Sequence, residues 1–167
     1  MTDLTIRHAT TEDAPEIRRI AEAGWNATYE SILEQETIDR AIEAWYDPES
    51  IRQIIEDGDV LSLVAERDTA VLGYASGGVS DEEAVGTLGA IYVDPDHWRE
   101  GVGTALLTEF ERVCKQAGCE KLEIRVLEEN DVGTAFYRNR GYRISETQES
   151  ELFGEPIRDR TVRTTIE

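Results

Sequence analysis

A chain of 167 residues is long enough to bury one sizeable core, so we expect residues 1–167 to form a single domain. The chain carries 36 Asp and Glu against 17 Lys and Arg, a formal net charge of −19, which excludes the clustered basic surface that nucleic acid binding requires. The two cysteines and two histidines are too few for a disulfide framework or a usual zinc site. We therefore expect no metal, and reduced, buried thiols at Cys114 and Cys119.

The N-terminus and the composition also bear on where the protein works. Residues 1–17 lack a basic start followed by an apolar run, and no stretch approaches the roughly 18 apolar residues of a membrane span. We expect a soluble, cytoplasmic protein without a membrane partner. The acidic, lysine-poor composition resembles that of halophilic cytosolic proteins, since about 1 M salt would screen the self-repulsion of such a surface. An acidic protein from an ordinary environment is the open alternative.

The N-terminal part predicts one strand followed by helices. Residues 4–9 have the pattern of a strand, and Thr10 or Thr11 can cap a helix whose first turn holds two acids and a proline. Apolar side chains recur at helical spacing and predict the buried face of this helix: Ile17, Ile20, Ala21 and Trp25. Residues 37–46 and 48–56 indicate two further short helices.

The middle of the chain predicts a hairpin and then a central strand. Residues 59–66 and 70–78 flank a turn signal at Arg67 and Asp68, which is typical of a hairpin. Residues 87–93 are more fully apolar, as expected for a strand at the centre of a sheet.

A helix is predicted between this central strand and the next one. Its apolar stripe consists of Val102, Leu106, Phe110, Val113 and Ala117. Residues 121–129 then alternate apolar and charged side chains, as a half-buried strand does. A strand, a packed helix and another strand make a parallel crossover. The turn before the helix therefore lies at the carboxyl end of the central strand.

This turn, in the segment DHWREGVGTALL at residues 96–107, is suited to an anion. The first N–H groups of a helix have no partner inside it and carry a partial positive charge. Gly101 and Gly103 lack the Cβ atoms that would keep a bulky group from these amides, so a pyrophosphate would fit. The open alternative is that both glycines merely let the chain turn and the helix pack closely.

Two other phosphate-binding patterns compete with this interpretation. No lysine lies near enough for a P-loop, and Leu106 stands where a dinucleotide-binding fingerprint needs its third glycine. Glu123 does lie near the distance expected of a ribose-binding acid. A nicotinamide-dependent dehydrogenase is therefore weakened as a hypothesis but stays open.

Two segments resemble the signatures of the GCN5-related N-acetyltransferases (GNAT family). Residues 88–118, LGAIYVDPDHWREGVGTALLTEFERVCKQAG, are similar to the acetyl-coenzyme A binding segment of that family, and residues 129–144, ENDVGTAFYRNRGYRI, are similar to its second signature. The resemblance covers nearly the whole chain. It implies an α/β (α+β) fold, with a mixed, mostly antiparallel sheet of about six or seven strands flanked by helices and splayed between its two central parallel strands.

The resemblance also implies an activity, the transfer of an acetyl group from acetyl-coenzyme A to a primary amine of a small molecule or a protein. Backbone groups near Ile91 and Val93 would pair with the pantetheine like a further strand, and one N–H would stabilise the oxyanion. Tyr137 is the implied catalytic residue, which hydrogen-bonds the departing sulfur. The residues implied to bind the cosubstrate are Ile91, Tyr92, Val93, Arg99, Glu100, Gly101, Val102, Gly103, Thr104, Asn130 and Tyr137.

Three positions depart from the pattern of this family. The usual Arg or Gln falls on Trp98, with Arg99 one place later, so either side chain could contact the phosphates. Gly133 stands where the second signature often has alanine. The glutamate that serves many relatives as general base matches Thr87, which cannot take that role.

The missing glutamate leaves open how the acceptor loses its proton. An alkylammonium has a pKa near 10.4 and must be deprotonated before it can attack. Asp81, Glu82 and Glu83 could accept this proton, and a solvated acidic loop is the alternative. A noncatalytic acyl-coenzyme A binding or sensing module is the second functional hypothesis. The sequence leaves the acceptor and a homodimer open, and its acidity mildly favours a cationic acceptor.

Overall fold

Seven strands form one sheet in the computed structural model, which describes residues 3–80 and 82–166. The strands are β1 (Thr5–His8), β2 (Leu61–Arg67), β3 (Ala70–Ser80), β4 (Val85–Val93), β5 (Lys121–Leu127), β6 (Arg143–Leu152) and β7 (Glu155–Thr165). Their order across the sheet is β1-β2-β3-β4-β5-β7-β6, and every neighbouring pair is antiparallel except β4 and β5. The mixed, mostly antiparallel sheet that the resemblance implies is confirmed.

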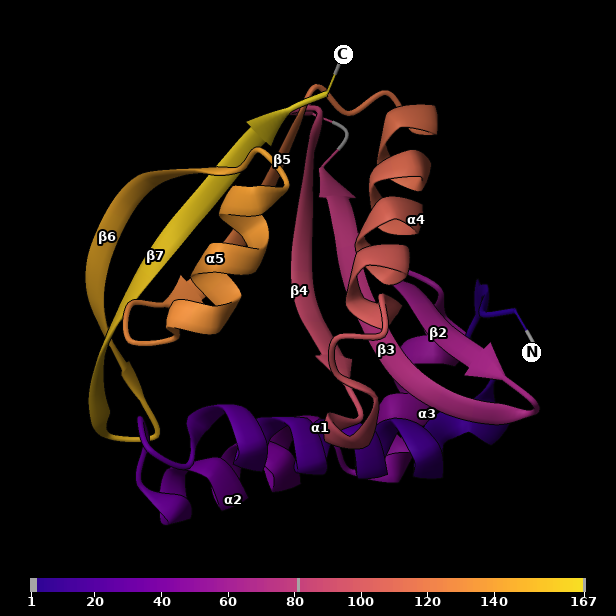
Figure 1. Ribbon diagram of the computed structural model, residues 1–167, viewed down its shortest axis with the longest axis horizontal. Coiled ribbons are helices and arrows are strands. Elements are labelled where there is room, and N and C mark those ends of the chain that lie inside the picture. The colour runs from indigo at the N-terminus through magenta and orange to yellow at the C-terminus, as the bar shows by residue number, and fades with distance from the viewer. Residues whose placement is uncertain (1–2, 81, 167) are drawn as a thin grey trace.

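Helices cover both faces of this sheet (Figure 1). The α-helices are α1 (Ala14–Tyr29), α2 (Gln35–Trp45), α3 (Pro48–Asp57), α4 (Val102–Gln116) and α5 (Asp131–Asn139). Leu63 and Val64 are neighbours in β2, yet Leu63 packs in a core with α4 and α5, whereas Val64 packs in a second core with α1, α2 and α3. Successive strand residues point to opposite faces, so the two groups of helices lie on opposite sides. In the described part of the chain, no helix has the length and apolarity of a membrane span.

Local sequence signals place most elements where the chain predicts them. The predicted face of the first helix is buried, with Ile17, Ile20 and Ala21 fully enclosed. The predicted hairpin is β2 and β3, and Asp68 and Thr69 at its turn have φ of 53° and 67°. Left-handed residues at both central positions match the right-handed twist of the two strands.

The buried stripe of α4 differs from the predicted one at its C-terminal end. Val102, Leu106 and Phe110 are buried as expected, but the stripe continues through Leu107 and Cys114. Val113 is only partly buried and Ala117, the C-cap residue, is exposed. The physical reason is that steps of four residues follow the contact with the sheet here, and these lead from Phe110 to Cys114. Cys114 and Cys119 are buried free thiols, as predicted.

The two central parallel strands separate part of the way along. Pairing between β4 and β5 joins Val85–Leu88 to Lys121–Ile124 and stops there, although β4 continues to Val93 and β5 to Leu127. Figure 1 shows the two strands diverging toward the carboxyl end of β4. The implied splay is confirmed. It leaves the last part of β4 without a strand partner on the β5 side.

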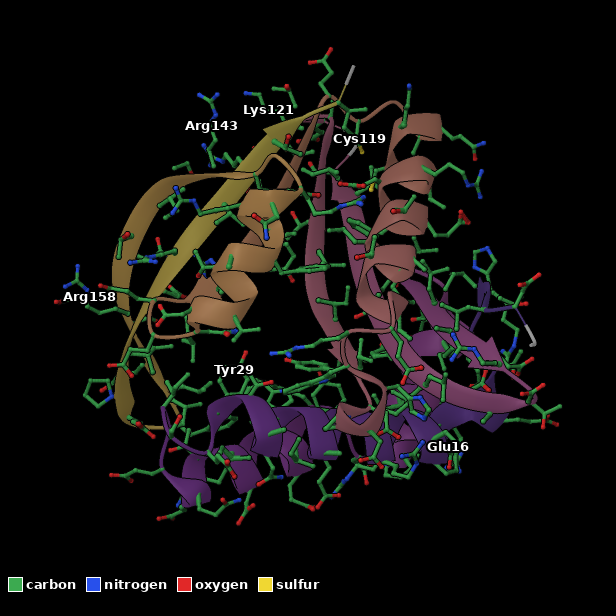
Figure 2. All side chains as sticks on the ribbon, viewed as in Figure 1. Glu16, Tyr29, Cys119, Lys121, Arg143 and Arg158 are labelled. Carbon is green, nitrogen blue, oxygen red and sulfur yellow. The ribbon has the colours of Figure 1, made fainter. Side chains whose placement is uncertain are left out.

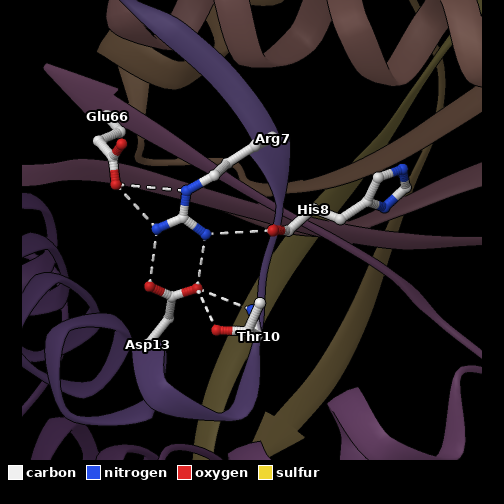
Figure 3. Close-up of polar contacts among 5 residues, drawn as sticks. All are labelled: Arg7, His8, Thr10, Asp13 and Glu66. Atoms are coloured by element: carbon white, nitrogen blue, oxygen red, sulfur yellow. Dashed lines mark hydrogen bonds and ion pairs between the residues drawn. The ribbon is translucent and has the colours of Figure 1, made fainter. Parts of the chain in front are cut away.

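An arginine ties the first strand to the helical layer and to β2 (Figure 3). Arg7 Nη1 and Nη2 donate to the two carboxylate oxygens of Asp13 at 2.8 and 3.0 Å, and Nη2 also donates to Glu66 at 2.9 Å. Asp13 Oδ2 accepts a further bond from the Thr10 N–H at 2.7 Å. The Asp13 side chain is only 9% exposed, so its carboxylate is largely shielded from water, whereas Arg7 and Glu66 are about one-third exposed.

Replacing Asp13 with asparagine is expected to lower the free energy of unfolding by about 1.5–3 kcal/mol, the usual range for hydrogen bonds to a charged partner. The Arg7 hydrogen bond holds the pKa of Asp13 below its ordinary value of 3.8. A depressed folded-state pKa adds stability above the unfolded-state pKa, and this stability is lost as the pH falls through the folded-state pKa. Urea unfolding from pH 7 to pH 3 should show a smaller loss in Asp13→Asn than in the wild type.

The matched control is Glu16→Gln, because Glu16 forms an ion pair with Arg19 in which both side chains are about half exposed. Exposed pairs contribute about 0.2–1 kcal/mol. Equal losses of stability in the two variants would contradict a special role of the Arg7 network.

Candidate functional site

The glycine turn lies where the sequence predicts it, between the end of β4 and the start of α4. A short 3-10 helix, Pro95–His97, follows β4, and Gly101 is the N-cap residue of α4. Within α4 the first backbone bond runs from the Ala105 N–H to the Gly101 carbonyl at 3.0 Å. The amides of Val102, Gly103 and Thr104 therefore have no partner inside the helix, and their N–H groups point out of its N-terminal end.

Glycine suits positions 101 and 103 of the turn for different physical reasons. Gly101 adopts a φ of 84°, a left-handed conformation that favours glycine. A Cβ at Gly103 would meet Phe136 at 3.6 Å and Val93 at 3.7 Å, which are ordinary contacts. The packing of α4 therefore does not require a glycine at position 103. The open face of this position is consistent with a bulky anion reaching the amides, and the residues present fit the diphosphate of coenzyme A.

The backbone of β4 presents alternate residues to the splay. The Asp94 N–H donates to Leu72 O on β3 at 2.9 Å, so Asp94 forms a hydrogen-bonded pair with that strand. In an antiparallel ladder such pairs alternate with pairs whose N–H and C=O point to the other side. The backbone groups of Val93 and Ile91 therefore face the opening toward β5, whereas those of Tyr92 face β3. The structure does not bring the Tyr92 backbone to the opening.

The Val93 carbonyl, which the sequence analysis left free, is already bonded. The indole Nε1 of Trp98 donates to it at 2.9 Å, because the turn folds the Trp98 side chain back onto the end of β4. The Ile91 backbone groups and the Val93 N–H have no such contact within the described residues. They remain the groups of β4 that can pair with an extended ligand.

Tyr137 lies on the other side of the opening, on α5, and Asn130 is the N-cap residue of that helix. The Tyr137 side chain is buried and its burial raises the pKa of the phenol, so the hydroxyl stays a neutral donor. Asn130 caps α5, with Oδ1 accepting from the Gly133 N–H at 2.9 Å. A Cβ at Gly133 would lie 2.6 Å from Asn130 Nδ2. The glycine at this departure from the family pattern therefore makes room for the cap.

Tyr29, the last residue of α1, joins the two sides of the opening. Its hydroxyl faces Tyr92 on β4 and Asn130 at the N-cap of α5, which lower the pKa of the phenol, while burial, the larger effect, raises it. Figure 2 shows the Tyr29 side chain rising from α1 toward α5. The Trp25 ring packs on it with centroids 4.8 Å apart. The sequence analysis assigned Tyr29 no role, because only the packing of α1 against β4 brings it to the opening.

The acids that could serve as proton acceptors lie elsewhere. Glu82 and Glu83 are exposed and precede Val85, at the end of β4 that is still paired with β5. Six steps along β4, at about 3.3 Å each, separate Val85 from Ile91, roughly 20 Å. Asp81 lies outside the described residues. The structure does not bring Glu82 or Glu83 to the splayed end.

Charged side chains around the turn are mostly paired. Glu100 accepts from Arg67 Nη1 at 2.9 Å and lies 3.3 Å from His97 Nδ1, and these contacts lower its pKa. These contacts occupy the Glu100 carboxylate, so only the backbone of Glu100 is available to bind the cosubstrate. Arg99 has a φ of 67° and forms no ion pair with any described residue. Its guanidinium is exposed and carries no competing carboxylate.

A cavity of about 470 Å³ lies beside the carboxyl end of β5. Its walls come from the segment after α1, the segment after β5 and the β6–β7 hairpin. The residues that line it are Ile32, Leu33, Leu127, Glu128, Glu129, Glu149, Ser150, Glu155, Pro156, Ile157 and Arg158. The cavity adjoins the opening, since Glu129 directly precedes Asn130 and the N–H groups of Ile32 and Leu33 donate to the Tyr29 carbonyl.

Comparison with known proteins agrees with this arrangement. The model of the Acetyltransferase (GNAT) family matches residues 25–142. A spermidine N(1)-acetyltransferase of Thermoplasma acidophilum is 27% identical over 156 residues, covering 91% of this chain and 96% of that protein. An acetyltransferase of Yersinia enterocolitica is 33% identical over 114 residues, covering 68% of this chain and 77% of that protein.

Solved structures show the same fold. The PaiA N-acetyltransferase of Thermoplasma acidophilum, in complex with coenzyme A, superposes with a TM-score of 0.87 at 24% identity, covering 98% of this chain and 99% of that one. A GCN5-related N-acetyltransferase from Rhodopseudomonas palustris gives a TM-score of 0.83 at 21% identity, with coverages of 99% and 98%. With the fold, the glycine turn and the family match in agreement, the chain belongs to the GNAT family and is an N-acetyltransferase that uses acetyl-coenzyme A, not a dehydrogenase.

Proposed function

We propose that this enzyme acetylates a primary amine of a small, flexible polycation such as a diamine or polyamine. The observation that carries this proposal is the acidic cavity beside the splayed strands. Four carboxylates line it, from Glu128, Glu129, Glu149 and Glu155, against one guanidinium, from Arg158. A second ammonium group of the acceptor would lie in this cavity while the first reaches the thioester.

The partners of these carboxylates favour a cationic ligand. Glu128 is paired with Arg158 at 3.1 Å, and Glu155 accepts from the Glu34 N–H at 3.0 Å. Glu129 and Glu149 are exposed and form no ion pair with a described residue. Two carboxylates therefore remain uncompensated at the rim, and they attract an ammonium group.

The apolar part of the lining fits the rest of such a molecule. Ile32, Leu33, Leu127 and Ile157 contribute aliphatic surface between the carboxylates. A polyamine alternates charged nitrogens with short methylene chains, so it can use both kinds of surface. The spermidine N(1)-acetyltransferase among the relatives adds support for this class of acceptor.

The proposed roles of the chain in the transfer follow from the geometry. The amides of residues 101–104 hold the diphosphate, and the free backbone groups of Ile91 and the Val93 N–H hold the pantetheine and the thioester oxygen. Acetyl-coenzyme A supplies an acyl group on a good leaving thiolate. The neutral amine forms the C–N bond as the C–S bond breaks, and Tyr137 hydrogen-bonds the thiolate that departs. Before the attack, the ammonium group that reaches the thioester gives up one proton to water at the opening. The second proton, which the nitrogen loses as the amide forms, ends on the thiolate to give the free thiol of coenzyme A.

Removing the two unpaired carboxylates together, in Glu129→Gln/Glu149→Gln, is expected to raise the KM for spermidine by about tenfold, because an ammonium loses about 1.4 kcal/mol of attraction. The KM for a monoamine of similar length should change little. Initial rates of free thiol release measure both, in about 0.1 M and about 2 M KCl, since salt screens such attraction.

The matched control is Glu56→Gln, which removes an exposed carboxylate of α3 away from the cavity. Its KM for spermidine should equal that of the wild type. An equal rise in KM for the monoamine and for spermidine in the double variant would contradict a polycation site.

We also propose that residues 1–167 act as one catalytic domain in a saline cytoplasm. The one sheet that the described residues form, with a hydrophobic core on each of its faces, supports one domain. The net charge of −19 supports a saline environment, because concentrated salt would screen the repulsion among these carboxylates.

A further inference from the structure

Trp98 is the departure from the family pattern that the mechanism above leaves without a role. The residue is 43% exposed, yet its indole N–H is fixed, since Nε1 donates to the Val93 carbonyl at 2.9 Å. The bond joins the turn to the last residue of β4, immediately beside the predicted diphosphate site.

The residues around Trp98 are anchored as well. Asp94, at the start of the turn, accepts from Arg19 Nη1 at 2.9 Å and from the Asp96 N–H at 3.0 Å. After Trp98 the next anchored residue is Glu100, held by Arg67 at 2.9 Å. Arg99 therefore lies between Trp98 and Glu100, whose side chains are both held by hydrogen bonds.

Arg99 adopts a backbone conformation that an arginine rarely takes. Its φ of 67° is left-handed, and such a conformation persists only where the surrounding structure imposes it. The Trp98 indole on one side and the Glu100 carboxylate on the other supply that constraint. The Arg99 guanidinium itself forms no ion pair with a described residue, although carboxylates outnumber cations two to one in this chain.

We infer that Trp98 is a positioning residue, whose indole N–H bond to the Val93 carbonyl fixes the turn so that Arg99 binds the diphosphate of the cosubstrate. The side chain at position 98, where the family usually has Arg or Gln, thus does not contact the phosphates. Arg99 supplies the cationic contact instead. This assignment rests on the diphosphate lying at the glycine turn, which is part of the proposed function. It also means that the pantetheine pairs with Ile91 and the Val93 N–H while the Val93 carbonyl keeps its indole partner.

A double-mutant cycle tests this inference, with coenzyme A binding measured by calorimetry for Trp98→Phe, Arg99→Ala and the double variant. Phenylalanine keeps a ring at position 98 and loses the N–H. We expect each single variant to bind coenzyme A about five- to tenfold more weakly, which corresponds to one lost hydrogen bond or ion contact. The double variant should bind no more weakly than Arg99→Ala, because Trp98 acts through Arg99.

A second readout separates positioning from a general loss of structure. The KM for acetylpantetheine, which lacks the diphosphate, should be the same in Trp98→Phe and in the wild type, whereas the KM for acetyl-coenzyme A rises. The control Trp45→Phe alters another half-exposed indole, on α2, and should leave coenzyme A binding unchanged.

Three results would overturn the inference. Strictly additive losses in the cycle would mean that Trp98 contributes independently of Arg99. Tighter coenzyme A binding by Trp98→Phe would mean that the indole must leave the Val93 carbonyl for the pantetheine. An Arg99→Ala variant with wild-type affinity for coenzyme A would show that Arg99 does not bind the diphosphate. If instead no variant, wild type included, bound coenzyme A at all, the diphosphate site itself would be wrong and the proposed function would fail with it.

Discussion

Replacing Gly103 with aspartate is expected to weaken coenzyme A binding by about a hundredfold. The new carboxylate would stand on the open face of the second residue of α4, about 5 Å from the bound diphosphate, where repulsion costs about 3 kcal/mol at an effective dielectric constant near 20. The fold should not suffer, because a Cβ at this position meets only ordinary contacts, the nearest being Phe136 at 3.6 Å. Calorimetric titration with coenzyme A, together with the midpoint of thermal unfolding, measures both effects.

Gly103→Asp should lose coenzyme A binding without losing stability. An acid in the first turn of a helix interacts favourably with the helix dipole, by about 0.3–1 kcal/mol, so Gly103→Asp should be at least as stable as the wild type. The control Gly103→Ala adds the methyl group without the charge. Its fold should be unchanged, as a Cβ there meets only ordinary contacts, and the difference in affinity between the two variants separates the effect of the charge from crowding at the amides. A stable Gly103→Asp variant with wild-type affinity would show that the diphosphate does not lie at these amides.

Replacing Tyr137 with phenylalanine is expected to lower kcat by about a hundredfold, the smaller end of what a positioned proton donor contributes. Only the hydroxyl is lost, since the ring keeps its neighbours Phe136 and Tyr142, with centroids 5.2 and 5.8 Å away. The KM for acetyl-coenzyme A should change little, because the hydroxyl acts on the sulfur as it departs. Single-turnover rates of thiol release measure the chemical step directly.

The pKa of Tyr137 also predicts how kcat should change with pH. Burial raises the pKa of Tyr137 above its ordinary value of 10.0, so the phenol remains protonated throughout the range in which the acceptor amine loses its proton. The wild-type kcat should therefore rise with pH as the amine deprotonates and show no fall up to about pH 10 from ionisation of Tyr137.

The matched control for Tyr137 is Tyr142→Phe. Tyr142 is a neighbouring buried tyrosine whose hydroxyl donates to Glu111 at 3.0 Å, away from the splay. It should lose stability but keep its kcat. A Tyr137→Phe variant with wild-type kcat would show that the Tyr137 hydroxyl does not assist the departure of the sulfur.

The sequence by itself determined the features that depend on neighbours along the chain. The period-two pattern of β5 put Leu122, Ile124 and Val126 in the core, because successive strand residues face opposite sides. Gly101 and Gly103 marked a helix start with exposed amides, because the missing Cβ atoms and the unpaired N–H groups are properties of a few consecutive residues. The fold and the acetyl transfer were implied by two such segments, and the family match confirms them.

Only the tertiary structure decided which side chains meet at the splay. Glu82 and Glu83 are close to the central strand in sequence, but strand direction carries them to its far end. The sequence left Trp98 as a candidate for the phosphates, whereas the structure shows its indole bonded to Val93. No sequence pattern explained the glycine at position 133, where the structure shows that a Cβ would collide with the Asn130 cap. Tyr29 lies near enough to Asn130, 101 residues further along the chain, for Asn130 to affect its pKa. These contacts follow from how strands pair and helices dock, which no local pattern of residues encodes.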